Sequence, residues 1–367
     1  MSILPEQDLK YLVALANFPK FGPVRLKKLQ NYFPSAEEAF RAPLPDLLAA
    51  GIDERTAGEF FAFRPTVKPD LLMEKLIKEE VKVLALSDEN YPRLLKEIYD
   101  PPALLYYKGA LEDSDQLSLA VVGTRKYSPY GKLVAERLVR ELAQNSLTIV
   151  SGLALGIDAL AHTAALEAGG RTVAVLGSGL DRQNIYPSQN RYLAEKILAV
   201  GGCLLSEFPL GTPALRHHFP QRNRIVSGLS LGVLVIEAGE KSGSLITARF
   251  ALEQGREVFA VPGHILSPVS AGTNEIIKRG ARLVTAGRDI FETLDLALAT
   301  DFLNNRKTLP ETEEEKRVVA FLGAEPKQVD ELKRETGLDI NILNSTLTIM
   351  EMKGMIKNLG NLTYILL

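Results

Sequence analysis

The sequence predicts an α/β protein with a parallel β-sheet core, a helical module before the sheet and a winged helix after it. Three observations lead to this prediction. Residues 1–64 read as two helical hairpins, short apolar runs alternate with helical segments from residue 117 onward, and three helices with a β-hairpin end the chain. A chain of 367 residues is too long for one ordinary domain, so two or three are expected.

The helical module covers residues 1–64. Apolar residues at helical spacing flank a turn at 18–23, and helical segments at 45–50 and 55–63 flank a second turn. The pattern is similar to a helix-hairpin-helix or SAM-like module, whose hairpins can present backbone amides to a DNA phosphate. Only Gly22 of the usual two hairpin glycines is present. DNA contact and packing or partner binding therefore both stay open for this module.

A second domain is expected over residues 66–300. A helix at 70–79, a short strand at 81–86 and two prolines at 101 and 102 predict an extension that covers the sheet. The apolar runs beyond it are short and non-alternating, as in strands that are buried on both faces. The predicted strands are 117–122, 147–150, 172–176, 203–205, 233–236 and 258–261, and the predicted helices are 130–144, 157–168, 190–200 and 244–254. Such βα units imply a parallel sheet that binds ligands beyond the carboxyl ends of its strands.

The end of the chain reads as a linker at 301–315 and a winged helix at 316–367. Helices at 316–322, 329–336 and 340–353 precede strands at 355–359 and 362–367. A DNA-reading winged helix places cations along its third helix, but this helix offers mainly Asn, Ser and Thr. Residues 310–367 hold 7 Lys+Arg against 10 Asp+Glu, a net charge of −3. We therefore expect a partner-binding or regulatory role here rather than strong DNA binding.

Charge and cysteine content limit the classes of function. The net charge of −2 excludes a uniformly basic nucleic-acid coat, whereas residues 117–299 hold 19 Lys+Arg against 15 Asp+Glu, a local net charge of +4. The single cysteine, Cys203, excludes an intrachain disulfide and a cysteine-based zinc site. The first residues lack the features of a secretory signal, and no apolar stretch is long enough to span a bilayer. We therefore expect a cytoplasmic protein without membrane contact.

The most informative stretch is 216–224, which reads Arg-His-His-Phe-Pro-Gln-Arg-Asn-Arg and contains no carboxylate. Arginines this close repel one another unless an anion neutralises them, and their forked guanidinium groups suit phosphate. The side chain of Phe219 can stack on a base. The alternative is a solvated basic loop. Two motifs at strand ends favour the anion site.

The first motif is Gly123-Thr124-Arg125, where glycine permits close backbone approach and the next two side chains can bind a phosphate. The second, residues 242–244, is Ser-Gly-Ser at the start of a predicted helix, where amides and hydroxyls can hold an anion or only cap the helix. The glycines at 177 and 179 do not complete Gly-x-Gly-x-x-Gly, and no phosphate-loop lysine is present. We therefore expect no nucleotide cofactor and no metal.

Several acidic, histidine and tyrosine residues near the strand ends each have two interpretations. Asp158 and His162 share a helix face, so they can form an acid–base pair or, more simply, a buried pair that fixes a loop. Glu207 and Glu237 can serve a glycosyl-cleaving enzyme, although we favour a role in orienting the arginines. Tyrosines 127, 130 and 186 can stack on bases or pack in the core.

Taken together, these motifs resemble the DprA/Smf family of DNA-processing proteins. The residues that carry the resemblance lie between about 80 and 295. They are Gly123-Thr-Arg with Ser128-x-Tyr130-Gly131; Ser151-Gly-Leu-Ala-x-Gly-Ile-Asp158 with Ala161-His162; Val175-Leu-Gly-x-Gly-Leu-Asp181 with Tyr186-Pro187-x-x-Asn190; Leu205-Ser-Glu207; Phe219-Pro-x-Arg-Asn-Arg224; Ile236-Glu-Ala238; Lys241-Ser-Gly-Ser244; and Val261-Pro-Gly263. The resemblance implies an extended Rossmann-like fold that binds single-stranded DNA, forms a homodimer through this domain and loads a RecA-type recombinase while displacing single-strand-binding protein.

The resemblance also implies roles for individual residues. Those that should hold phosphates are Arg125, Arg222, Asn223 and Arg224, and those that should shape the pocket are Gly123, Thr124, Gly177, Gly179, Ser242, Gly243 and Ser244. Many members carry a lysine after the Tyr-Pro pair, where this chain has Arg191 as its nearest cation. The protein is therefore expected to be a binding protein and not an enzyme.

Two other functions stay open. A nucleoside monophosphate phosphoribohydrolase-like enzyme shares this type of fold, but its Pro-Gly-Gly-x-Gly-Thr loop is replaced here by Lys241-Ser-Gly-Ser. An interaction hub for the recombinase can use an apolar patch near 283–298.

Overall fold

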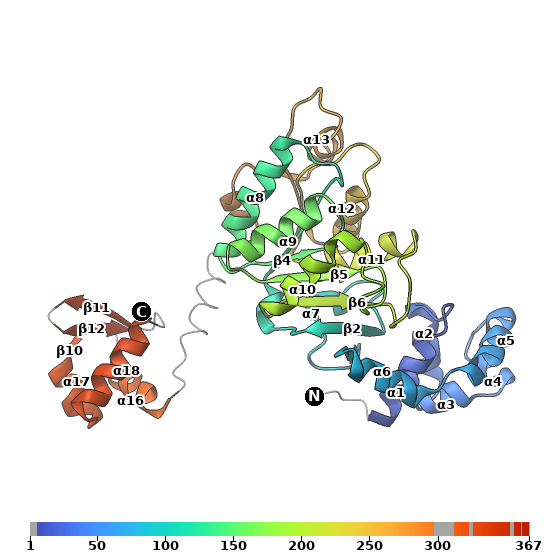
Figure 1. Ribbon diagram of the computed structural model, residues 1–367, viewed down its shortest axis with the longest axis horizontal. Helices are drawn as coiled ribbons and strands as arrows, with labels where there is room; N and C mark the ends of the chain where they lie inside the picture. Colours follow the sequence, from blue (N-terminus) through green and yellow to red (C-terminus); the bar gives the residue numbers. More distant parts are fainter. Residues whose placement is uncertain (1–5, 297–311, 323–325, 353–355, 361, 367) are drawn as a thin grey trace. The chain divides into compact units, whose positions relative to one another are not determined.

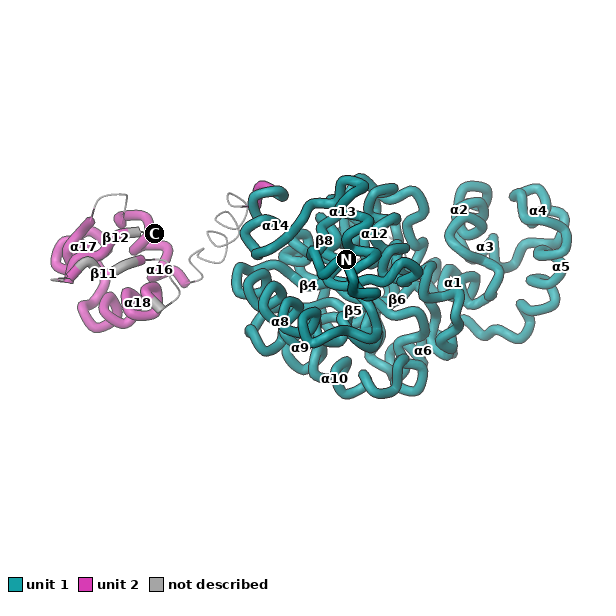
Figure 2. The backbone as a smooth tube through the Cα atoms, turned by 90° about the horizontal axis from the view of Figure 1, so that it is seen from above, with its two compact units in different colours: residues 1–294 teal, residues 295–367 magenta. Residues whose placement is uncertain are grey.

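The computed structural model describes residues 6–296, 312–322, 326–352, 356–360 and 362–366. The chain forms two compact units, residues 1–294 and 295–367, and each is described separately below (Figure 2). No helix in the described ranges is long and apolar enough to cross a bilayer.

Five short helices build the helical module of the first unit. They are α1 (Glu6–Ala16), α2 (Pro23–Tyr32), α3 (Ala36–Arg41), α4 (Leu44–Ala49) and α5 (Glu54–Phe63). The side chains of Ser35 and Asp53 cap α3 and α5 by accepting hydrogen bonds from backbone amides one turn on. Helix α3 was not predicted. The buried residues of this module form one hydrophobic cluster with residues of the sheet, so the boundary at residue 64 stays a prediction.

The sheet of the first unit has nine strands in the order β1-β2-β6-β5-β4-β3-β7-β8-β9 (Figure 1). The strands are β1 (Lys82–Ala85), β2 (Leu104–Gly109), β3 (Ser118–Val122), β4 (Thr148–Ser151), β5 (Thr172–Leu176), β6 (Cys203–Ser206), β7 (Gly232–Val235), β8 (Glu257–Ala260) and β9 (Arg282–Leu283). Strands β3 to β9 pair in parallel, whereas β1 and β2 join the β6 edge in antiparallel pairs. The predicted parallel core is confirmed. In the segment expected to cover the sheet, β1 and β2 extend the sheet, whereas Tyr91, Leu95 and Ile98 pack against it.

Helices cover both faces of the sheet. The helices in this region are α6 (Pro69–Lys78), α7 (Arg93–Lys96), α8 (Pro129–Gln144), α9 (Ile157–Glu167), α10 (Arg191–Ala199), α11 (His218–Gly228), α12 (Ser244–Glu253), α13 (Ala271–Lys278) and α14 (Gly287–Thr293). Helices α8, α9 and α10 lie on one side of the sheet, and α12 and α13 on the other (Figure 2). Ile225 and Val226 of α11 pack in one cluster with Val233 and Val235 of β7. This arrangement leaves the carboxyl ends of the strands open between the connecting loops.

The position of β3 decides where a ligand can bind. The chain moves outward from β3 to β4, β5 and β6, and then returns to the other side of β3 to form β7. Neighbouring connections therefore leave β3 and β7 in opposite directions, which opens a crevice beyond their carboxyl ends.

The second unit is the predicted winged helix. It comprises α16 (Glu313–Phe321), β10 (Lys327–Gln328), α17 (Val329–Thr336), α18 (Ile340–Met352), β11 (Ile356–Gly360) and β12 (Thr363–Leu366). Helix α16 begins earlier than predicted because Thr312 and Glu315 form a reciprocal capping box, so residues 313–315 belong to a helix and not to the linker. The predicted linker residues 301–311 lie outside the described residues.

Candidate functional site

A cavity of about 1020 Å³ lies beyond the carboxyl ends of β3, β4 and β7. The loop after β3 contributes residues 123–126, the loop after β4 contributes Gly152 and Ala154, and the segment after β7 contributes Gly239 and residues 241–244. The first half of α11 closes the wall with Phe219, Arg222 and Asn223. The cavity therefore occupies the crevice that the strand order creates.

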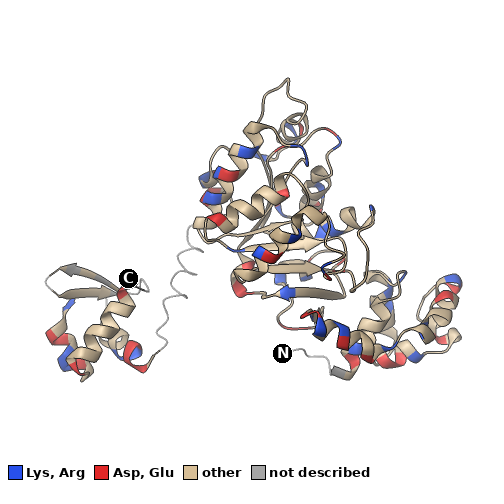
Figure 3. Ribbon diagram, viewed as in Figure 1, with Lys and Arg blue, Asp and Glu red and all other residues tan. Residues whose placement is uncertain are grey.

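The described lining of this cavity contains five basic residues and one acidic residue. The basic residues are Arg125, Lys126, Arg216, Arg222 and Lys241, and the acidic residue is Asp158. All of these cations except Arg222 are exposed, and none of the four has an ion pair with another described residue. Elsewhere in the first unit, Lys and Arg alternate with Asp and Glu along helices such as α8 (Figure 3). The excess of positive charge is thus local, as the sequence predicted.

Arg222 points into the protein beneath the cavity. It is 4% exposed, and its Nη1 donates to the carbonyl oxygens of Gly152 and Val175. Burial lowers the pKa of Arg222 to about 10, so the guanidinium is still charged at neutral pH. A Cβ on Gly152 would lie 2.2 Å from Arg222 Nη1, which explains why a residue without a side chain stands there. We interpret Arg222 as a fixed positive charge in the floor of the cavity.

Aromatic side chains stand beside the exposed cations. The Phe219 ring centroid lies 5.7 Å from that of Tyr186 and 5.8 Å from Cζ of Arg125. A Cβ on Gly177 would lie 3.2 Å from Phe219 Cδ1, so the absence of a side chain at 177 leaves room for the ring. Such a cluster offers flat apolar surfaces for a base next to positive charge for its phosphate.

The two strand-end motifs meet at this cavity. Ser242 Oγ lies 2.8 Å from Ser244 Oγ at the start of α12, and Asn223 Nδ2 donates to the Gly243 carbonyl oxygen over 3.4 Å. The Thr124 amide donates to the Glu237 carbonyl oxygen over 2.7 Å, which fixes the loop after β3 against the end of β7. Helix α12 therefore directs its amino terminus and two hydroxyls toward the cavity.

Gly123 lines the cavity as expected and is also constrained by packing. A Cβ there would lie 2.6 Å from a side-chain carbon of Ile157 and 3.0 Å from the carbonyl oxygen of Glu237. The residue is therefore required for packing within the protein.

Four predicted site residues do not line the cavity. Gly177 lies next to the Phe219 ring. Gly179 packs against Pro209 and Gly211. Arg191 donates to the carbonyl oxygens of Gln183 and Ile185 over 2.6 and 3.4 Å. Arg224 is buried and pairs with Asp100 over 2.9 Å and with Glu207 over 2.6 Å. Because successive helix residues are rotated by about 100°, Arg222 and Arg224 point to nearly opposite sides of α11.

The carboxylates near the strand ends have structural partners. Asp158 accepts from the amides of Gly152 and Ala154 over 3.2 and 3.4 Å, so it fixes a loop as expected, but it does so without His162. Burial raises the pKa of Asp158, an effect that the nearby Arg222 opposes. Glu237 accepts from the amide and hydroxyl of Ser128. The expectation that both glutamates orient arginines is therefore right for Glu207 and wrong for Glu237.

His162 does not pair with Asp158. Its Nδ1 lies 2.7 Å from Thr172 Oγ1, and burial lowers the pKa of the imidazole to about 3. Within the described residues, no group of three His, Cys, Asp or Glu side chains is placed to hold a metal ion.

Sequence reasoning did not single out Lys126 and Lys241 as cavity cations, although both adjoin motifs that it named. It placed Gly152 in a strand-end motif but not among the site residues, because the role of this glycine depends on Arg222, a residue 70 positions away. The position of the two lysines beside strand-end motifs is a signal that could have identified them as cavity residues. No local signal indicates that the glycine makes room for Arg222.

Comparison with known families and proteins gives a consistent result. The family described as DNA recombination-mediator protein A matches residues 82–295, and the DprA winged helix domain matches residues 304–361. Protein Smf of Escherichia coli is 40% identical over 317 residues, which cover 84% of this chain and 84% of that protein. DNA processing protein DprA of Bacillus subtilis is 47% identical over 218 residues, which cover 59% and 72%.

Solved structures agree with these matches. DNA processing protein A from Streptococcus pneumoniae superposes with a TM-score of 0.65 at 37% identity, covering 80% of this chain and 98% of that chain. The Helicobacter pylori protein, whose structure describes a single-stranded DNA binding mode, superposes with a TM-score of 0.52 at 35% identity, covering 59% and 95%.

Proposed function

The chain belongs to the DNA recombination-mediator protein A family, and we propose that it binds single-stranded DNA in the cavity beyond β3, β4 and β7. The relative from Helicobacter pylori is described as binding single-stranded DNA, which supports this assignment. The observation that carries it is the combination of five cations with one carboxylate around the half-buried ring of Phe219 and the exposed ring of Tyr186.

The aromatic cluster favours a single strand over a duplex. Bases of a single strand are free to stack on protein side chains, whereas duplex bases are already stacked on one another. Because the remaining contacts go to phosphates, we expect binding that tolerates any sequence and weakens steeply with salt. The test is fluorescence anisotropy of a labelled oligo-dT and of the same strand in a duplex. Equal affinity for both would contradict the proposal.

The bound strand is proposed to be protected and passed to a RecA-type recombinase during DNA uptake and recombination. In this proposal the protein acts in the cytoplasm as a homodimer through the sheet domain, and the recombinase replaces single-strand-binding protein on the strand. The assay is recombinase filament formation on oligo-dT coated with single-strand-binding protein. Light scattering checks the dimer. Unchanged filament formation on adding the protein would refute the loading role.

We propose binding without catalysis. The buried carboxylate of Glu237 is occupied by Ser128, and the phosphoribohydrolase loop is replaced at residues 241–244. Incubation with nucleoside monophosphates tests this directly. Release of free base in proportion to protein would favour the enzyme instead.

The winged helix is proposed to bind a partner or to regulate the protein. Its helix α18 carries no Lys or Arg over 340–352 and exposes Ile342 and Ile349 instead. Removal of residues 310–367 should leave the affinity for oligo-dT within about twofold of that of the full chain, since binding to the phosphates of DNA needs cations and α18 carries none. A collapse of affinity would assign DNA binding to this unit.

A further inference from the structure

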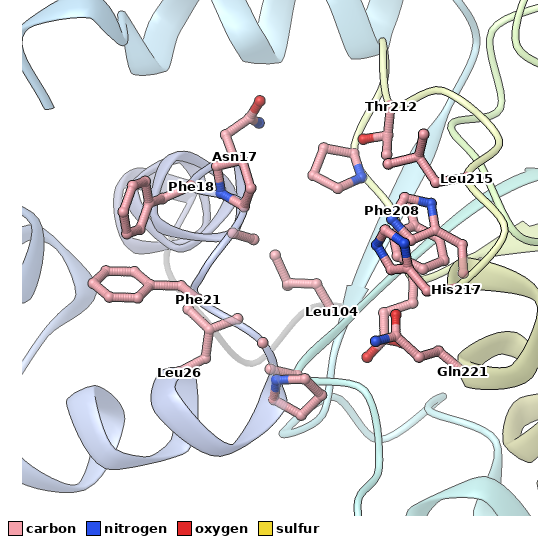
Figure 4. A pocket seen from close by; sticks show the side chains of 18 of the residues that line it. Asn17, Phe18, Phe21, Leu26, Leu104, Phe208, Thr212, Leu215, His217 and Gln221 are labelled. Atoms are coloured by element: carbon pink, nitrogen blue, oxygen red, sulfur yellow. The ribbon is translucent and has the colours of Figure 1, made fainter. Parts of the chain in front are cut away.

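A second cavity, of about 660 Å³, lies between the helical module and the sheet domain within the first unit. We call it the module cleft. Figure 4 shows Phe208, His217 and Gln221 on one side of it and Phe18, Phe21 and Leu26 on the other, with Leu104 between them. Its volume is in the range of small-ligand sites.

One wall of the module cleft is aromatic. The rings of Phe208 and His218 stack with centroids 4.1 Å apart and an interplanar angle of 24°, and His217 meets His218 edge-on at 4.5 Å. Amide side chains from both sides, Asn17 and Gln221, also line the cleft. An amide can both donate and accept hydrogen bonds, so these two side chains can bind the edge of any base. Flat rings with adaptable polar groups suit a nucleobase.

The charges of the cleft do not suit a phosphate. Its one arginine, Arg224, is already paired with Asp100 and Glu207, so no lining arginine or lysine of the described cleft is free. The Nη1 atom of Arg224 is nevertheless buried without a hydrogen-bond partner. A buried donor of this kind costs free energy unless a ligand or water accepts from it.

Helix α11 and the residues before it border both cavities. Arg216, Phe219 and Asn223 line the strand-end cavity, whereas His217, Gln221 and Arg224 line the module cleft. A strand held by its phosphates on one side of α11 can therefore place a base on the other side. The helical module supplies the outer wall of that second position.

We propose that the module cleft is a base-binding subsite for the same single strand whose phosphates occupy the strand-end cavity. This inference rests on the proposed function. It gives the helical module a direct part in DNA binding, through a base slot and not through backbone amides on phosphates.

The test uses anisotropy of labelled oligo-dT over a salt series with the full chain. The double variant His217→Ala/Gln221→Ala should bind about tenfold more weakly, as expected for the loss of one stacked base. Its salt slope should be unchanged because no phosphate contact is lost. Val24→Trp, which fills the cleft from the exposed module side, should give the same loss, and Gln144→Ala, an exposed position outside both cavity linings, is the matched control.

Photo-crosslinking identifies the occupant. Oligo-dT with a single 4-thiothymine should crosslink to peptides containing Phe208 or His217. Calorimetry with free thymidine monophosphate tests the other source of the base. Saturable binding that is lost in His217→Ala would mean that the cleft holds a free nucleotide and not a base of the strand, which would overturn the proposal.

Two further outcomes separate the proposals. If the cleft variants bind as wild type while Arg125→Ala still flattens the salt slope, the base slot is refuted and the proposed function stands. If wild type binds no oligo-dT even at low salt, both are refuted.

Discussion

Replacing Arg125 with alanine should flatten the salt dependence of DNA binding. Arg125, Lys126, Arg216 and Lys241 are the exposed cations around the cavity, and each is free to replace one counterion on a phosphate. At about −0.7 per phosphate on a single strand, four contacts give a slope of about −2.8 in log affinity against log salt. Raising salt from about 50 to about 200 mM should then weaken wild-type binding about 50-fold.

The variant retains three of these contacts. Its slope should be about −2.1, and the same change in salt should weaken binding only about 20-fold. The assay is anisotropy of labelled oligo-dT at five or more salt concentrations. Arg137→Ala is the matched control because it makes the same change in net charge but removes an arginine that is paired with Glu141 on α8. Equal slopes for wild type and Arg125→Ala, in a variant with wild-type circular dichroism, would refute the cavity as the phosphate site.

Three other predictions test the parts that hold the site. Arg224→Ala should lower the free energy of unfolding by about 3 kcal/mol, because it leaves buried carboxylate charge without its partner; a wild-type urea midpoint would contradict this. Gly152→Ala should weaken oligo-dT binding by displacing Arg222, whereas Gly58→Ala on α5, where a Cβ meets nothing within 4 Å and which lies outside the cavity lining, should bind as wild type; equal affinities would disprove the packing argument. His162 is neutral when folded down to about pH 3 but binds a proton near pH 6.5 when unfolded, so stability should fall as pH falls through this window, by about 2 kcal/mol from pH 7.5 to pH 5. His162→Gln should remove that loss in urea titrations at the two pH values, and an unchanged pH dependence would count against it.

The parallel core could be predicted because its strands are continuous apolar runs. Residues 117–122, for example, contain the fully buried β3, and the glycine and hydroxyl residues that follow it mark the strand end. The position of β2, between β1 and β6, could not be predicted in this way. Its pairing with β6 joins Tyr106 to Ser206 across 100 residues, and a local pattern does not contain such a contact.

The site could be predicted only in part, because closeness in sequence does not say which way each side chain points. Sequence proximity placed Arg216, Arg222 and Arg224 in one anion site, but residues 218–228 form helix α11, which separates them. Pro220 does not prevent this helix because it lies in the first turn, where its missing amide is not needed. The helical rotation directs Arg222 to the cavity and Arg224 to the buried pair with Glu207. Local composition identifies the basic residues, but the helix gives each a different role: Arg216 is exposed before it, Arg222 is a buried charge in the cavity floor, and Arg224 is held in an ion pair.

The most direct test of the account is the affinity of the full chain for labelled oligo-dT and for the corresponding duplex at low salt, with Arg125→Ala alongside. The account predicts tighter binding of the single strand and a clear loss in the variant. Absence of binding, or equal binding of single strand and duplex that does not change in Arg125→Ala, would contradict it.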